Sequence, residues 1–219
     1  MHRRQLLTTA AWFFAGTALS RAAEIAGQLP WYPNAGNPPA PVRPGAWQFF
    51  TLDEATAVEA LADRIIPPDP QTSGGKDAGC AVFVDRQLAG PYGRAEGHPA
   101  KTYRDGLAAL DRYCRAQHGK PFTDLSDDVK DELLKGLEDE KIKLEGVDGR
   151  AFFEGVITDV KAGFFADPIY GGNRDMVAWK MIGFPGARYN YLDWIDRHNE
   201  RYPLPPVSMM GRADWTPKR

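Results

Sequence analysis

The sequence predicts a mainly α-helical protein: a single helical domain with a glycine-, proline- and aromatic-rich loop and extended proline-rich termini. Apolar residues recur at helical spacing in five segments, which cover residues 51–66, 78–88, 101–118, 126–137 and 150–165. No alternating apolar and polar run is long enough for a sheet. Many of the 18 prolines lie outside these segments, in residues 30–44, 67–70 and 203–217.

The first predicted helix has a clear start and a clear end. Thr51 and Glu54 form a capping box, in which the threonine hydroxyl and the glutamate carboxylate satisfy backbone N–H groups at the helix start. Pro67 stops the helix after Ile66. Its apolar stripe comprises Val58, Leu61, Ala62, Ile65 and Ile66.

The next two helices end at glycines. Gly90 and the proline after it end the second, and Gly119 is placed to cap the third. We expect Asp85 and Arg86, on the second helix, to face solvent. The stripe of the third helix comprises Tyr103, Leu107, Leu110, Tyr113 and Cys114.

The fourth and fifth helices follow the same logic. Ser126 precedes the fourth, and Asp127 and Asp128 suit the positive end of its dipole. The charged run at 138–145 is typical of a solvated helix end. Apolar stripes comprise Val129, Leu133, Leu134 and Leu137 on the fourth helix, and Phe152, Phe153, Val156, Ile157, Val160 and Phe164 on the fifth.

Residues 167–189 form the loop, which cannot be one continuous helix. It is broken at Pro168, at Gly171 and Gly172, and again at residues 183–186. Between the breaks we expect a short helix over residues 173–182, and after the loop a last helix over residues 189–200. Such a loop either plugs the core or faces outward as a binding surface.

The amino-terminal residues are typical of a secretory signal. Arg3 and Arg4 precede an apolar stretch that is short for a membrane span, and small residues follow near position 22. The paired arginines favour the twin-arginine route; the alternative is an uncleaved membrane anchor. We therefore predict a signal peptide at 1–23, an extended proline-rich arm at 24–49 and the helical domain with its extended tail at 50–219.

The sequence lacks the motifs that indicate nucleic-acid, dinucleotide, haem or metal binding. The net charge of −2, with basic and acidic residues interspersed, argues against nucleic-acid binding. The sequence has no GxGxxG after a strand, no CxxCH and no HExxH, and its four histidines are scattered. We expect no catalytic, cofactor-binding or metal-binding residue in this chain.

The only two cysteines are Cys80 and Cys114, on the second and third predicted helices. In an exported protein an even pair suggests a disulfide, worth up to about 4 kcal/mol. Two buried free thiols are the alternative, and the bridge is slightly favoured.

Four segments together resemble one known family. They are the paired arginines, residues 51–69 (TLDEATAVEALADRIIPPD), residues 79–93 (GCAVFVDRQLAGPYG) and residues 163–186 (GFFADPIYGGNRDMVAWKMIGFPG). The chain resembles the small (gamma) subunit, subunit 3, of membrane-bound FAD-dependent sugar and sugar-acid dehydrogenases of the gluconate 2-dehydrogenase type. The resemblance extends from Phe50 to Trp215. Ala178 stands where glycine is expected, a change between small residues.

The resemblance implies a non-catalytic subunit with no cofactor of its own. In that family an FAD-containing large subunit oxidises the substrate, a multihaem cytochrome c subunit passes on the electrons, and the small subunit supports folding and export of the large one. Enzymes acting on gluconate, sorbitol, fructose, glucose and ketogluconate share such a subunit. The implied location is the periplasm, associated with the membrane through the complex.

Two functional hypotheses follow. In the first, the chain is a chaperone-like escort that engages the twin-arginine machinery, with Tyr170, Asn173, Arg174 and the proline-rich tail facing the large subunit and Met176, Trp179 and Phe184 buried. In the second, it is a stand-alone periplasmic enzyme or small-molecule-binding protein with a polar pocket at Asp167, Tyr170, Asn173 and Arg174.

Overall fold

The computed structural model describes residues 41–42, 45–188 and 191–209 and is mainly helical. The predicted signal peptide at 1–23 and most of the predicted arm lie outside the described residues. The helices are α2 (Leu52–Ile65), α3 (Cys80–Ala89), α4 (Pro99–His118), α5 (Asp127–Glu138), α6 (Gly149–Phe165) and α7 (Val177–Ile182). Short 3₁₀ turns are η1 (Tyr92–Arg94), η2 (Phe122–Asp124), η3 (Pro168–Tyr170), η4 (Arg174–Met176) and η5 (Leu192–Trp194).

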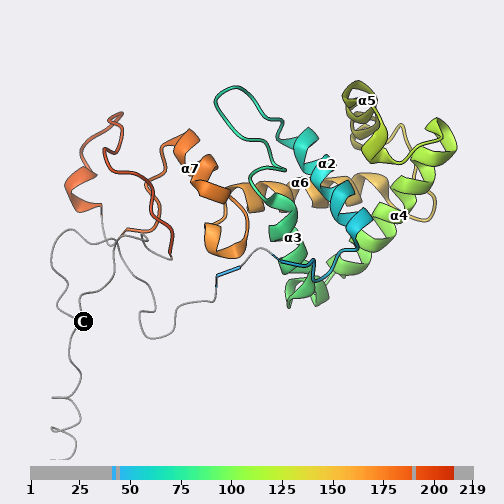
Figure 1. Ribbon diagram of the computed structural model, residues 1–219, viewed down its shortest axis with the longest axis horizontal. Coiled ribbons are helices and arrows are strands. Elements are labelled where there is room, and N and C mark those ends of the chain that lie inside the picture. The colour runs from blue at the N-terminus through green and yellow to red at the C-terminus, as the bar shows by residue number, and fades with distance from the viewer. Residues whose placement is uncertain (1–40, 43–44, 189–190, 210–219) are drawn as a thin grey trace, which may run out of the picture.

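The five longest helices form a body around α6, which packs against α2, α3, α4 and α5. In Figure 1 α5 lies at one end of this body, and α7 with the segment after it lies at the other. The described residues contain only isolated bridges in place of a sheet, which confirms the predicted fold class. The core is apolar and includes Val58, Leu61, Val84, Leu110, Leu137, Phe152, Val156, Val160 and Phe164.

Local capping explains where these helices begin and end. Both halves of the capping box at Thr51 and Glu54 are present, as predicted. The Asp148 side chain accepts a hydrogen bond from the backbone of Ala151 and so starts α6. Gly119 follows α4 with φ of 69°, a left-handed conformation that glycine adopts without strain. Capping residues that can be recognised in the sequence therefore set where these helices begin and end.

The predicted last helix over residues 189–200 is wrong. Among the described residues of that range, only Leu192–Trp194 are helical, and they form a single 3₁₀ turn. Tyr191 and Trp194 both pack on the ring of Tyr202, with centroid separations of 6.0 and 5.0 Å. The contacts with Tyr202 hold Tyr191 and Trp194 in a loop, and these residues therefore do not form a regular helix.

The favoured disulfide is also absent, because Cys80 and Cys114 are separate buried thiols. Cys80 is the first residue of α3 and Cys114 lies near the end of α4, and the two helices diverge from their connection (Figure 1). Burial raises the pKa of Cys80 to about 12 and that of Cys114 to about 11, so both stay protonated at neutral pH.

Within the part of the chain that the structure describes, no helix is both long enough and apolar enough to cross a membrane.

Candidate partner-binding surface

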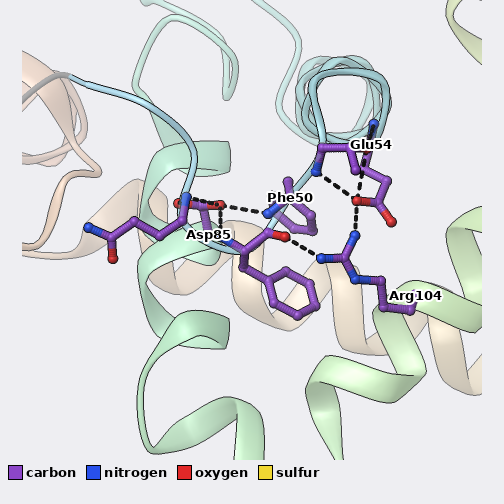
Figure 2. A network of polar contacts seen from close by, with 7 residues as sticks. Phe50, Glu54, Asp85 and Arg104 are labelled. Atoms are coloured by element: carbon purple, nitrogen blue, oxygen red, sulfur yellow. Dashed lines mark hydrogen bonds and ion pairs between the residues drawn. The ribbon is translucent and has the colours of Figure 1, made fainter.

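Residues 46–50, here called the strap, are fixed to the body just before α2. The Asp85 carboxylate on α3 is fully buried and accepts hydrogen bonds from three consecutive backbone N–H groups of the strap. The donors are Gln48, Phe49 and Phe50, each with an N–O distance of 2.9 Å, and Figure 2 shows Asp85 beside Phe50. The expectation that Asp85 faces solvent is therefore wrong: it is the main anchor of the strap.

Two arginines complete the attachment of the strap. Arg86 forms an ion pair with Asp85 and donates to the Ala46 carbonyl over 3.1 Å. Arg104 on α4 donates to the Phe49 carbonyl and to Glu54, and its guanidinium lies 4.2 Å from the centre of the Phe49 ring (Figure 2). The strap is thus held by α3 and α4 together.

Glu54 joins this network to the start of α2. Partial burial raises its pKa, but hydrogen bonds from Thr51 and Arg104 outweigh burial and hold the pKa below its ordinary value. The carboxylate is therefore ionised at neutral pH, as both the cap and the ion pair require.

A second buried carboxylate, Asp159 on α6, is held by two tyrosine hydroxyls. Tyr92 donates to one of its oxygens and Tyr103 to the other, both over 3.0 Å. Burial raises the pKa of Asp159, and the two hydrogen bonds offset only part of this rise. Burial and the Asp159 charge in turn raise the pKa of Tyr92 to about 12. The cluster ties η1 and α4 to α6.

Asp159 gives the fold a defined pH dependence. Since folding raises its pKa, the folded protein holds the proton more tightly than the unfolded chain does. The resulting stabilisation is full at low pH and is lost as the pH rises from 3.8 through the folded pKa. In urea unfolding at a series of pH values, wild type should lose stability relative to Asp159→Asn over this window. A difference that stays constant across the window would contradict this assignment.

The loop at 167–186 packs closely on α6. Asn173 is fully buried, donates to the Ala166 carbonyl over 2.9 Å and accepts from the Ala178 N–H over 3.0 Å. The Trp179 indole donates to the Phe165 carbonyl over 2.9 Å. These bonds join the end of α6 to the start of α7, so α7 has one defined position against the body.

Three of the predicted loop orientations need correction. Asn173 does not face a partner, because both ends of its amide are used within the protein. Phe184 meets the Trp179 ring edge to face with a centroid distance of 5.0 Å but remains 43% exposed, and Met176 is only half-buried. Trp179 is buried, and Tyr170 and Arg174 are exposed, as predicted.

The proposed polar pocket is not available as a ligand site. Both oxygens of the Asp167 carboxylate accept hydrogen bonds from the chain itself. The Asn173 amide donates one hydrogen bond and accepts another within the chain. Arg174 donates its backbone N–H to Ala78, and its side chain is exposed. The polar side-chain atoms of Asp167 and Asn173, two of the four pocket residues, are therefore already hydrogen-bonded within the fold.

The exposed apolar side chains gather at one end of the molecule. Of the ten large hydrophobic residues that are exposed among the described residues, eight fall within residues 165–204. We call these eight the α7-end surface: Phe165, Tyr170, Met181, Ile182, Phe184, Leu192, Ile195 and Leu204. Met181 and Ile182 are 51% and 57% exposed, on a helix that is fixed to the body. Because large exposed apolar patches mark protein or membrane interaction sites or ligand-binding grooves, these eight side chains are the candidate binding surface.

The charges in this segment are balanced. Its five basic residues match its five acidic residues: Arg174, Lys180, Arg188, Arg197 and Arg201 against Asp167, Asp175, Asp193, Asp196 and Glu200. These ten side chains therefore give the segment no net formal charge. Among the described residues, no group of three or more His, Cys, Asp or Glu side chains could hold a metal ion.

A helical body that exposes aromatic and aliphatic side chains at one end is the kind of protein that binds another protein there. A family model for gluconate 2-dehydrogenase subunit 3 matches residues 52–186, more than half of the 219-residue chain. The chain therefore belongs to the gluconate 2-dehydrogenase subunit 3 family, whose members are subunits of a dehydrogenase complex. No curated protein and no solved structure matches it.

Proposed function

We propose that the chain is the non-catalytic small subunit of a periplasmic, membrane-associated FAD-dependent dehydrogenase complex. It binds the flavoprotein large subunit through the α7-end surface and supports the folding and twin-arginine export of that subunit. The observation that carries the proposal is the concentration of exposed apolar side chains at one end of a subunit from a dehydrogenase complex. Such side chains are stabilised when a partner removes them from water.

The structure of this surface suits a preformed interface. Asn173 and the Trp179 indole fix α7 to the end of α6, and Phe184 packs edge to face against Trp179. Side chains already held in place lose little conformational freedom on binding, which favours affinity. Met, Phe and Tyr side chains are also typical of the buried centre of protein interfaces.

In this proposal the cofactors belong to the partners: FAD to the large subunit and haem c to a multihaem cytochrome subunit. This chain supplies binding and the export signal. The strap supports the export role, because it attaches the segment that follows the signal to the folded body through Asp85 and Arg104. A signal linked in this way to a partner-binding body can carry a folded partner across the membrane.

The export role predicts a specific result for Arg3→Lys combined with Arg4→Lys. Both this chain and the large subunit should remain in the cytoplasm, because one signal serves both. Arg21→Lys, outside the arginine pair, should leave export unchanged. The measurement is immunoblotting of both subunits in periplasmic and cytoplasmic fractions. Normal export of the large subunit in the double variant would rule out the escort role.

A further inference from the structure

Two segments far apart in the sequence dock on the turn at residues 167–169. From the C-terminal side, Ser208 donates its hydroxyl and Met209 its backbone N–H to the Asp167 carboxylate, each over 2.6 Å. From the N-terminal side, Val42 donates its N–H to the Ile169 carbonyl over 2.9 Å. Asp167 also accepts from the Ile169 N–H over 3.0 Å, which orients its carboxylate.

The C-terminal segment also pairs with the chain just after α7. Ala187 donates its N–H to the Val207 carbonyl over 2.7 Å, and Val207 donates to the Pro185 carbonyl over 3.2 Å. A Cβ on Gly186 would lie 2.2 Å from the Val207 carbonyl oxygen, so this approach requires glycine. Residues 187–206, here called the C-terminal loop, thus have their two ends held together beside α7 (Figure 1).

The C-terminal loop has no buried core of its own. No residue of the loop that the structure describes is fully buried. Its internal contacts include those of the Tyr191 and Trp194 rings with Tyr202, with the Arg188 guanidinium 4.8 Å from the centre of the same ring. Arg188 also donates to the Pro205 carbonyl, and the Arg197 guanidinium lies 4.5 Å from the centre of the Trp194 ring. Leu192, Ile195 and Leu204 stay exposed. Fixing the two ends of such a loop reduces the number of conformations that its exposed residues can adopt.

We propose that Asp167 is a positioning residue that closes the C-terminal loop, and that the closed loop forms part of the surface on which the dehydrogenase subunit binds. The inference rests on the proposed function and extends it beyond residues 52–186, the segment that the family model matches. Asp167 contacts the loop end and not the partner. Its effect on binding comes from holding the exposed side chains of the closed loop, Leu192, Ile195 and Leu204, in one arrangement.

The test compares Asp167→Ala and Ser208→Ala with Asp69→Ala in the full-length protein. Asp69 is the matched control, because its carboxylate also accepts two backbone N–H groups, from Gln71 and Thr72, but in another loop. One readout is hydrogen exchange of the amides in residues 191–209 of the free subunit. The other is the dissociation constant for the purified dehydrogenase subunit.

Asp167→Ala should speed exchange in residues 191–209, leave α2 to α6 protected and weaken binding by about tenfold or more. Ser208→Ala should do the same to a smaller extent, because it removes only one of the hydrogen bonds that the Asp167 carboxylate accepts. Asp69→Ala should change neither readout for these residues.

Three results would overturn the inference. The first is unchanged exchange in residues 191–209 of Asp167→Ala, and the second is faster exchange with unchanged affinity. The third is wild-type protein that does not bind the dehydrogenase subunit, which would remove the proposed function as well. Asp167→Ala could lose protection from hydrogen exchange throughout α2 to α6, which would mean that the whole fold is destabilised. In that case Ser208→Ala provides the same test, since it deletes only one hydroxyl at the loop end.

Discussion

Asp85→Ala should lower the free energy of unfolding by about 3–5 kcal/mol. The substitution leaves three strap N–H groups and the Arg86 guanidinium without their shared acceptor, at a side chain that is 0% exposed. A buried N–H group that loses its acceptor destabilises the fold, because its lost hydration is no longer offset by a hydrogen bond. The strap should then separate from α3, so its amides should exchange rapidly.

Asp148→Ala is the control for this prediction, because Asp148 also accepts from a backbone N–H but is exposed at the start of α6. It should lower stability by only about 1 kcal/mol. Urea unfolding followed by circular dichroism measures both variants. Equal effects of the two substitutions would mean that the strap contributes little to the stability of the body.

Gly172→Ala should disrupt the junction between the loop and α6. A Cβ at this position would lie 2.1 Å from the Gly163 carbonyl oxygen, which belongs to the backbone of α6 and cannot turn aside as a side chain can. The two segments must move apart, with an expected loss of about 3 kcal/mol or more. Because the same junction positions α7, binding at the α7-end surface should weaken too.

Gly155→Ala is the matched control within α6. A Cβ at Gly155 meets nothing within 4 Å, so the only change is the higher helix propensity of alanine. This variant should gain about 0.5–1 kcal/mol. Thermal unfolding of Gly172→Ala and Gly155→Ala therefore separates the effect of steric crowding at Gly172 from that of helix propensity. A Gly172→Ala protein as stable as wild type would show that the approach of the loop to α6 is not tight.

The body could be predicted from the sequence because its determinants are local. The capping box at Thr51, the glycine after α4 and the apolar stripes all act within a few residues along one helix. Asp85 was missed although a signal was present. Ala81, Val84 and Leu88 recur at helical spacing on the buried face of α3, and Asp85 lies on that same face. The spacing therefore indicated that the Asp85 carboxylate is buried. Its donors lie 35–37 residues away, beyond the reach of a periodicity argument.

The loop and tail could not be predicted because their determinants are tertiary. The bonds of Asn173 to Ala166 and Ala178, and those of Asp167 to Ser208 and Met209, depend on which segments meet in the fold. Aromatic residues near Tyr191 looked helical by spacing, but their partner Tyr202 follows them in the chain. The sequence indicated an outward-facing surface near Tyr170; only the structure showed that its apolar part lies on α7 and beyond.

If the α7-end surface binds the dehydrogenase subunit, charges placed on it should weaken that binding, and an affinity measurement with a matched variant tests this most directly. Met181→Glu with Ile182→Glu places two charges on this surface at side chains more than half exposed, so the fold should be unaffected. Leu52→Glu is the control, since Leu52 is 72% exposed but lies on α2. The double variant should bind the purified dehydrogenase subunit at least about 100-fold more weakly than wild type, while Leu52→Glu binds normally. Wild-type affinity in the double variant would contradict the account.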